Sequence, residues 1–545
     1  MSRVILKSNP ASSTPSDNEE KAWTEPSINF RTGMFRPVAT EAENLNCRIV
    51  QGAIPSDFPE GTYFRNGPNP YFPPKDTDAY HYFDGDGMIA SFSISSSTIR
   101  FSHKWVNTER LQADIMKNKS VYEFGSMATG KLLLEGTVNE KGVRMGKANT
   151  SLIFHNNKLL ALEEADLPYI IHPQTLETLG STYSFEKYVG SGADEHVFTK
   201  NIFTAHPKID KETKELIGYG CGYDPTKAVF DYYVINQNGF ITTKFPIPLR
   251  GTSYNHDFAI TKNYSICFDG NLTLNWQTLF ASDNNKLPEK PGEMWQFNSD
   301  KPGRIGIFPR HAKSEQEVTW FDVEPFCVSH TVNAYEEDGT IVIISNNIGY
   351  EGFEPNFPSY TPKDPLANLH EWRLNLKTNG VKERNLRGNI RSDFPCINNK
   401  YTGKKNRYLY SQLVNYEEPN HAPFLYGAYK YDLKTNTYKE QIWRGSDDIH
   451  DDDGKFYGGE GIFVPRINRQ RSKARNIDDP NLEDDGYLLV LVNNVNKRRT
   501  ELRMYDCKCF GERNSLKCTI ESPRRLLPLG THGIWLNKDE VEMGP

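Results

Sequence analysis

From about residue 30 onward, apolar and polar positions form short runs rich in β-branched and aromatic residues, each closed by a turn. Long stretches with helical periodicity are scarce, so the pattern predicts a chain that is mostly β. The clearest example spans residues 325–345, where an apolar run through Val332 is followed by Asp338-Gly339 and a second apolar run. An Asp-Gly pair between such runs favours a tight hairpin. His330 therefore lies on a predicted strand.

Similar turns recur along most of the chain. Four of them place a threonine in a polar segment between predicted strands, at residues 172–178, 209–215, 375–380 and 432–437. A further hairpin is indicated by Asn238-Gly239. Recurrent hairpins indicate repeated sheets or blades, and radial closure of such repeats protects their exposed edges. We therefore expect an all-β repeat fold.

Three segments depart from this pattern. Residues 1–28 are rich in Ser, Pro, Asn and Glu and are predicted to form a disordered tail. Residues 105–136 are the best candidate for an insertion, because residues 108–116 have helical periodicity and several glycines follow them. Residues 466–485, rich in Asn, Arg and Asp, are expected to form a surface loop.

Composition and charge exclude some classes of function. The 545 residues carry a formal net charge of −6, so the chain has no basic field to attract a phosphate backbone and nucleic acid is not an expected partner. Eight cysteines are scattered without the paired spacing of a zinc site, which is typical of reduced thiols in an intracellular protein. Nothing in the sequence identifies a protein partner.

The chain also lacks the usual signals of secretion or membrane insertion. No run approaches the roughly 18 apolar residues of a transmembrane helix, and the first 25 residues lack the apolar core of a secretory signal. We expect a cytoplasmic protein that at most touches a membrane peripherally. The acid-poor first 16 residues leave an organelle transit segment as an alternative.

Histidines are the strongest candidates for chemistry. Of 13 histidines, four stand in the setting expected of a strand end that points inward: His206, His256, His330 and His532. Taken singly, such a histidine is more often a hydrogen-bonded core residue than a metal ligand. The four lie too far apart to match a local metal motif, so the fold would have to assemble any site. The residues alone do not favour these four over the other histidines.

Eight stretches carry a family resemblance: FRNGPNPY at 64–71, HYFDGDGM at 81–88, KANT at 147–150, LALEEAD at 160–166, TAHP at 204–207, HTVNAY at 330–335, GGEGIFVPR at 458–466 and THG at 531–533. They resemble the carotenoid cleavage dioxygenase family, most closely its plant and fungal branch, and they follow the family's order. The resemblance implies one domain over residues 29–545. Its fold would be a seven-bladed β-propeller whose iron-containing face carries a helical cap, with the cap near residues 105–136.

The resemblance also implies that the four histidines bind one Fe²⁺ per chain, with dioxygen as co-substrate. Imidazole suits ferrous iron, and an octahedral ion with four protein ligands keeps two open positions. Glu164 and Glu460 stand where the family places carboxylates that hold the ligand imidazoles. Asp393 stands where a glutamate is usual. Because its side chain is shorter, we expect a bridging water instead of a direct contact.

By resemblance, the activity is oxidative cleavage of one carbon–carbon double bond of a carotenoid or apocarotenoid, a hydrophobic small molecule, to two carbonyl products. Three alternatives remain open. One is cleavage of a phenolic stilbene, as in the lignostilbene branch of the family. Another is a propeller that binds carotenoids without catalysis, because fold does not guarantee function. The retinoid isomerase chemistry of the vertebrate member is the third.

Two positions favour the polyene over the stilbene. Stilbene cleavers of the family engage the substrate's phenol with a lysine and a tyrosine, and this chain resembles them with Glu163 and Trp105 at those places. A carboxylate does not stabilise a phenolate, whereas an indole suits the wall of an apolar tunnel. We therefore expect both residues to line a substrate tunnel. Ile115, Met116 and residues 132–134 are expected to form an apolar entrance that touches membranes, with a role in the core as the alternative.

Overall fold

The computed structural model describes residues 35–73, 82–120, 144–180, 183, 185, 202–222, 228–275, 295–348, 368–388, 390–415, 424–443, 456–467, 482–524 and 530–544. Parts of the sequence predictions therefore lie outside the described residues: the tail at 1–28, the segment 132–134 and most of the loop at 466–485.

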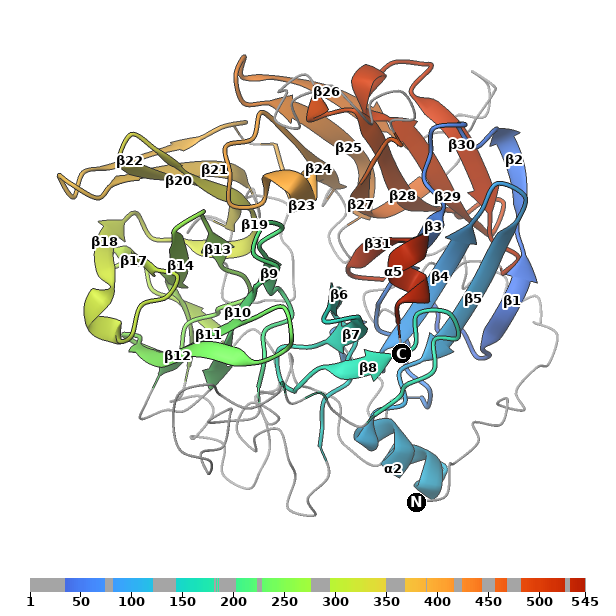
Figure 1. Ribbon diagram of the computed structural model, residues 1–545, viewed down its shortest axis with the longest axis horizontal. Coiled ribbons are helices and arrows are strands. Elements are labelled where there is room, and N and C mark those ends of the chain that lie inside the picture. The colour runs from blue at the N-terminus through green and yellow to red at the C-terminus, as the bar shows by residue number, and fades with distance from the viewer. Residues whose placement is uncertain are drawn as a thin grey trace.

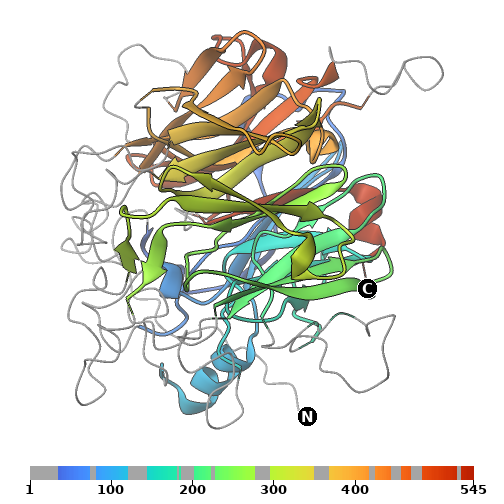
Figure 2. The same ribbon diagram turned by 90° about the vertical axis from the view of Figure 1, so that its left-hand side faces the viewer.

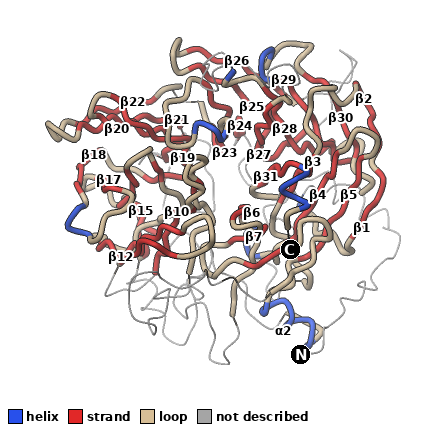
Figure 3. Tube along the Cα trace, viewed as in Figure 1, coloured by secondary structure: helices blue, strands red, loops and turns tan. Residues whose placement is uncertain are grey.

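Seven sheets stand around a central axis as the blades of a propeller (Figures 1 and 3). The predicted all-β fold with seven blades is confirmed. We number the blades from 1 to 7 along the chain and call the strand of each blade that lies nearest the axis its inner strand. The inner strands are β31, β6, β9, β13, β19, β23 and β27.

The first four blades and one accessory ribbon have the following strands. Blade 1 contains β1 (Ala42–Asn46), β5 (Ile99–Trp105), β4 (Met88–Ile94), β3 (Gly61–Arg65) and β31 (Gly533–Asn537). Blade 2 contains β6 (Ser151–His155), β7 (Lys158–Leu162) and β8 (Tyr169–Ile171). Blade 3 contains β9 (Lys208–Ile209), β10 (Leu216–Gly222), β11 (Val229–Ile235) and β12 (Ile241–Pro248). Blade 4 contains β13 (Ala259–Ile260), β14 (Tyr264–Asp269), β17 (Gly303–Pro309) and β18 (Thr319–Val323), and the separate ribbon pairs β15 (Leu272–Leu274) with β16 (Trp295–Phe297).

The last three blades complete the ring. Blade 5 contains β19 (Cys327–Glu337), β20 (Thr340–Ile348), β21 (Asn368–Asn375) and β22 (Val381–Asn385). Blade 6 contains β23 (Ser392–Cys396), β24 (Tyr408–Asn415), β25 (Phe424–Asp432) and β26 (Thr437–Ile442). Blade 7 contains β27 (Phe456–Pro465), β28 (Gly486–Asn494), β29 (Arg499–Asp506), β30 (Leu516–Glu521) and β2 (Arg48–Gly52).

Both ends of the chain close the ring. The consecutive strands β1 and β2 pair with the outer strands β5 and β30 of two neighbouring blades, 1 and 7. The C-terminal strand β31 becomes the inner strand of blade 1 by pairing with β3, so that Trp535 lies opposite Tyr63. The first and last blades are therefore joined by backbone hydrogen bonds as well as by apolar packing, which includes Phe92 and Leu491.

The local turns follow the sequence signals. Between β19 and β20, Asp338 and Gly339 have φ angles of 49° and 76°, and positive φ at both central residues is the pattern of a type I′ hairpin turn. Gly239 has a φ of 86° in the turn between β11 and β12. Both predicted hairpins are confirmed, and the first of them fixes the strand that carries His330.

The predicted helix of the insertion is also present. Helix α2 spans Glu109–Lys117, and its N-cap Thr108 accepts a hydrogen bond from the backbone N–H of Leu111. A short helix α5, Lys538–Glu542, follows β31. Figure 2 shows α5 on one face of the ring and α2 apart from it at the rim. Neither of the two helices that the structure describes has the length and apolar character needed to cross a membrane.

Candidate metal centre

The fold brings the four predicted histidines together at the propeller axis. His206, His256 and His532 stand just before the inner strands β9, β13 and β31, and His330 lies on the inner strand β19. One ring nitrogen from each residue belongs to a group whose members all lie within 4.8 Å of one another. Blades 3, 4, 5 and 1 therefore each contribute one imidazole to a single cluster.

The other three blades contribute the three predicted carboxylates. Glu164, in the connection after β7, contacts Nδ1 of His256 through Oε1. Glu460, on β27, accepts a hydrogen bond of 2.9 Å at Oε1 from Nδ1 of His532. Asp393, on β23, completes the set from blade 6. Every blade of the propeller thus supplies one side chain to the cluster or to its immediate surroundings.

Asp393 corrects the sequence prediction. Its Oδ1 accepts a direct hydrogen bond of 2.7 Å from Nδ1 of His330, so no bridging water is needed. The shorter side chain reaches because the pairing of β23 with β24 shifts register between Asp393 and Cys396, and Phe394 between them has a positive φ of 52°. Such a bulge bends a strand and redirects its side chains, here toward the axis.

The hydrogen-bond pattern fits a metal ion. Where a carboxylate accepts from Nδ1–H, the neutral ring presents the lone pair of Nε2 to the centre. The Nε2 atoms of His256 and His330 are 3.1 Å apart, close to the roughly 3 Å expected of two adjacent ligands that each lie about 2.1 Å from one ion. Nε2 of His206 is buried and has no hydrogen-bond partner among the described residues. The four imidazoles therefore have the donor set and spacing of a metal site.

Burial and mutual repulsion favour neutral imidazoles at two positions. Burial lowers the pKa of His206 well below its usual value, and the other three imidazoles lower it further. Burial also lowers the pKa of His532 despite the opposing effect of Glu460. At His256 burial acts in the same direction, but the carboxylates of Glu164, Asp257 and Asp393 together outweigh it, Glu164 contributing most, and the pKa is raised. A metal ion at Nε2 would take the place of the second proton that Glu164 favours.

Two of the carboxylates are held in the ionised form. Burial alone would raise the pKa of Asp393, but the imidazole of His330, together with hydrogen bonds from the N–H of Phe394 and the hydroxyl of Ser329, outweighs burial and the pKa is lowered. The pKa of Glu460 is lowered in the same way by His532 and then by Arg65. Ionised carboxylates around buried imidazoles favour a cation at the centre.

Arg65 is a partner of the site that sequence reasoning did not identify. Its side chain is buried, and Nη1 lies 3.6 Å from Oε2 of Glu460. The same oxygen accepts a hydrogen bond of 2.9 Å from the backbone N–H of Gly533. Arg65 belongs to the stretch FRNGPNPY. The place of that stretch among the family motifs was the only sequence signal that could have pointed to Arg65. Arg65 anchors the carboxylate that holds His532.

Aromatic rings cover parts of the cluster. The ring of Phe394 lies 5.1 Å from that of His330 and 5.3 Å from that of His532. The ring of Tyr254 is stacked on His256 at 5.5 Å. These rings shield the imidazoles from water, and neither residue was predicted to belong to the site.

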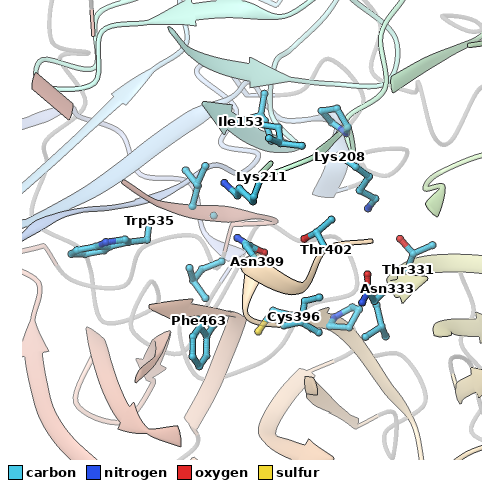
Figure 4. A pocket seen from close by; sticks show the side chains of 18 of the residues that line it. Ile153, Lys208, Lys211, Thr331, Asn333, Cys396, Asn399, Thr402, Phe463 and Trp535 are labelled. Atoms are coloured by element: carbon cyan, nitrogen blue, oxygen red, sulfur yellow. The ribbon is translucent and has the colours of Figure 1, made fainter. Parts of the chain in front are cut away.

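A cavity of about 270 Å³ runs along the inner strands beside the cluster (Figure 4). Its lining includes Pro207, Thr331 and Gly533, each of which directly follows a histidine of the cluster. Lys208 and Lys211 add two ammonium groups to this lining. The cavity is therefore a partly polar space on the axis.

The two predicted tunnel residues have other partners in the structure. Trp105 is buried against Met88 and Leu111, and its indole N–H donates a hydrogen bond of 2.8 Å to the backbone oxygen of Asn69. Oε2 of Glu163 accepts hydrogen bonds from the backbone N–H groups of Lys147 and Ala148. The tunnel role of both residues stays a prediction.

A seven-bladed propeller with four imidazoles converging on its axis defines a class of metal-binding propeller proteins. The chain belongs to the family described as retinal pigment epithelial membrane protein, whose model matches residues 35–537. This confirms the resemblance to carotenoid oxygenases. Among curated proteins it is similar to the carotenoid 9,10(9',10')-cleavage dioxygenase 1 of Pisum sativum, with 31% identity over 530 residues that cover 94% of this chain and 90% of the relative.

Solved structures agree on the fold. A lignostilbene dioxygenase from Pseudomonas brassicacearum superimposes with a TM-score of 0.74 at 24% identity, covering 94% of this chain and 99% of the other. An apocarotenoid oxygenase variant from Synechocystis superimposes with a TM-score of 0.71 at 24% identity, covering 92% and 97%. The shared fold extends over almost the whole of each chain.

Proposed function

We propose that this protein is a non-haem iron(II) dioxygenase that cleaves one carbon–carbon double bond of a carotenoid or apocarotenoid to two carbonyl products. The observation that carries the proposal is the cluster of four imidazoles, three of which contact carboxylates. Membership of the family and the similarity to a plant carotenoid cleavage dioxygenase support the choice of substrate class.

His206, His256, His330 and His532 would hold one ferrous ion. When bound, that ion supplies the redox chemistry that activates dioxygen. Glu164, Asp393 and Glu460 orient the rings that they contact and raise their basicity. The four ring nitrogens would be the protein's ligands to that ion, and dioxygen would be the co-substrate.

The remaining task of the protein is to position the double bond. The rings of Phe394 and Tyr254 lie against the imidazoles of His330 and His256 and give the centre apolar surroundings there. A conjugated, uncharged substrate needs apolar walls more than hydrogen-bond donors. Positioning of this kind converts an encounter between two molecules into a reaction within one complex.

The partners of Glu163 and Trp105 support a polyene substrate. Glu163 already accepts backbone hydrogen bonds, and the indole N–H of Trp105 is already bonded to Asn69. These contacts hold one carboxylate oxygen of Glu163 and the indole N–H of Trp105 on the backbone, and neither residue supplies the lysine or tyrosine that would engage a phenol. Stilbene cleavage is the second candidate, because a lignostilbene dioxygenase is among the structural relatives.

Peripheral contact with a membrane would give access to an apolar substrate. Met116 on α2 is 69% exposed, whereas Leu111 on the same helix is fully buried. An exposed methionine beside a helix terminus fits insertion into the surface of a lipid bilayer. Flotation with liposomes is the test: Met116→Glu should reduce binding, and equal flotation of both proteins would contradict the contact.

The activity is tested by incubating the purified protein with a panel of carotenoids, apocarotenals and stilbenes under ¹⁸O₂. We expect aldehydes or ketones from at least one polyene, identified by mass and carrying label from dioxygen. Cleavage of a hydroxystilbene with no product from any polyene would replace the first candidate by the second. No product from any substrate, with iron bound, would favour a carotenoid-binding propeller without catalysis.

A further inference from the structure

We propose that Asp257 is a positioning residue that holds His206, His256 and His330 at the spacing needed to bind one metal ion. The proposal rests on the proposed function, because it takes the four histidines as the ligands. It concerns a different residue, whose carboxylate binds the chain neighbours of the histidines and not their rings.

The three histidines differ in how firmly their own strands hold them. His206 and His256 stand just before β9 and β13, which are strands of only two residues each. Each of these strands has only two residues in register with its neighbour. His330, in contrast, lies within β19, a strand of 11 residues. Backbone pairing alone therefore fixes His330 better than it fixes His206 or His256.

Asp257 connects the three strands. It directly follows His256 and is 3% exposed. Its Oδ2 accepts hydrogen bonds from the backbone N–H and the hydroxyl of Thr331, at 2.8 and 2.7 Å. Its Oδ1 lies 2.7 Å from Nζ of Lys208, the second residue after His206. One buried carboxylate thus links the neighbours of three cluster histidines, each from a different blade.

The local chemistry requires a carboxylate at this position. Oδ1 also accepts a hydrogen bond of 2.7 Å from the backbone N–H of Phe258, so all four partners of Asp257 are donors. A carboxylate has only acceptors and satisfies all of them. An amide in its place would turn its NH₂ group toward donors at one end. Asparagine would therefore break either the link to Lys208 or the link to Thr331.

Lys208 compensates the buried charge. Figure 4 shows Lys208 and Thr331 near one another at one side of the axial cavity. An ion pair of this kind leaves no uncompensated charge, whereas removal of one partner is costly. The ammonium also lies 5.9 Å from the ring centroid of Phe258. These contacts hold the start of blade 3 against blade 4.

The test compares Asp257→Asn with Asp269→Asn. Asp269 is an equally buried carboxylate of the same blade. Among the described residues it pairs with Arg250 and Arg304, away from the four histidines. Affinity for Co²⁺, used as the probe metal, is measured by competition with a chelator. The visible absorption bands of bound Co²⁺ report the ligand geometry, and unfolding of the metal-free proteins reports stability.

We expect Asp257→Asn to bind Co²⁺ about 10- to 100-fold more weakly, as is usual for residues that orient metal ligands, and to shift the absorption bands. Asp269→Asn should lower the stability of the metal-free protein but leave affinity and bands unchanged. If both variants lose stability and neither changes affinity or bands, Asp257 is only a structural residue and the proposal is wrong.

Two milder changes guard against a variant that does not fold. Lys208→Met removes the ion pair with Asp257. Thr331→Val removes the hydroxyl bond but keeps the bond from the backbone N–H. Each should therefore weaken Co²⁺ binding less than Asp257→Asn does. Thr331→Ser keeps the hydroxyl and should bind Co²⁺ as tightly as the unaltered protein does. If Lys208→Met and Thr331→Val bind Co²⁺ as tightly as the unaltered protein does, the positioning role of Asp257 is contradicted. A folded, unaltered protein that binds no metal would instead contradict the proposed function.

Discussion

The hydrogen bond between Asp393 and His330 gives the sharpest prediction about the metal centre. At 2.7 Å between Oδ1 and Nδ1, in a buried setting, it joins an ionised acceptor to an imidazole N–H. Hydrogen bonds to charged groups contribute about 1.5–3 kcal/mol, and each 1.4 kcal/mol is a factor of ten in affinity. Asp393→Asn should therefore weaken metal binding by roughly 10- to 100-fold, as much as the loss of a longer glutamate would.

Asp393→Glu separates the structural account from the sequence-based expectation. If the aspartate were too short to reach, glutamate would strengthen the contact. In the structure the direct bond already exists, so an added methylene, about 1.5 Å longer, overfills the space between β23 and His330. We expect weaker metal binding, measured by competition with a chelator, with Asp269→Asn as the control. Tighter binding by Asp393→Glu would refute the reasoning.

Further predictions concern the carboxylates, the substrate and acid stability. Glu164→Gln and Glu460→Gln should each lower metal affinity about 10- to 100-fold in the same competition assay. The unaltered enzyme should yield no aldehyde from a hydroxystilbene by mass analysis, and Glu163→Lys with Trp105→Tyr is the change most suited to create that activity. Burial lowers the pKa of His103 from 6.5 to about 3, so the folded state loses stability as pH falls below about 6.5. Urea unfolding at pH 7 and pH 5 should show a smaller loss for His103→Gln.

Local sequence signals predicted local structure well. The turn at Asp338-Gly339 needs positive φ at both residues. Aspartate and glycine tolerate that conformation, so this dipeptide was enough to predict the hairpin. The helical periodicity of residues 108–116 predicted helix α2, and the structure adds that Thr108 is its N-cap. Each of these features depends on residues that are neighbours in the chain.

The cluster of histidines depends on the closure of the whole ring. His206 and His532 lie far apart in the sequence, with most of the blades between them along the chain. Only a family resemblance could select them from the other histidines. The resemblance did not predict the reach of Asp393, because a bulge at Phe394 sets it. It did not predict Asp257 or Arg65 either, because their contacts join different blades and leave no periodic trace in the sequence.

The most direct test of the central claim is iron analysis of the purified protein beside the variant His206→Ala/His532→Ala. We expect close to one Fe²⁺ per chain in the unaltered protein and none in the variant. Both should unfold cooperatively, because these side chains lie at the axis while the apolar packing lies between the blades. Stoichiometric iron in the folded double variant would contradict the assignment of the metal centre.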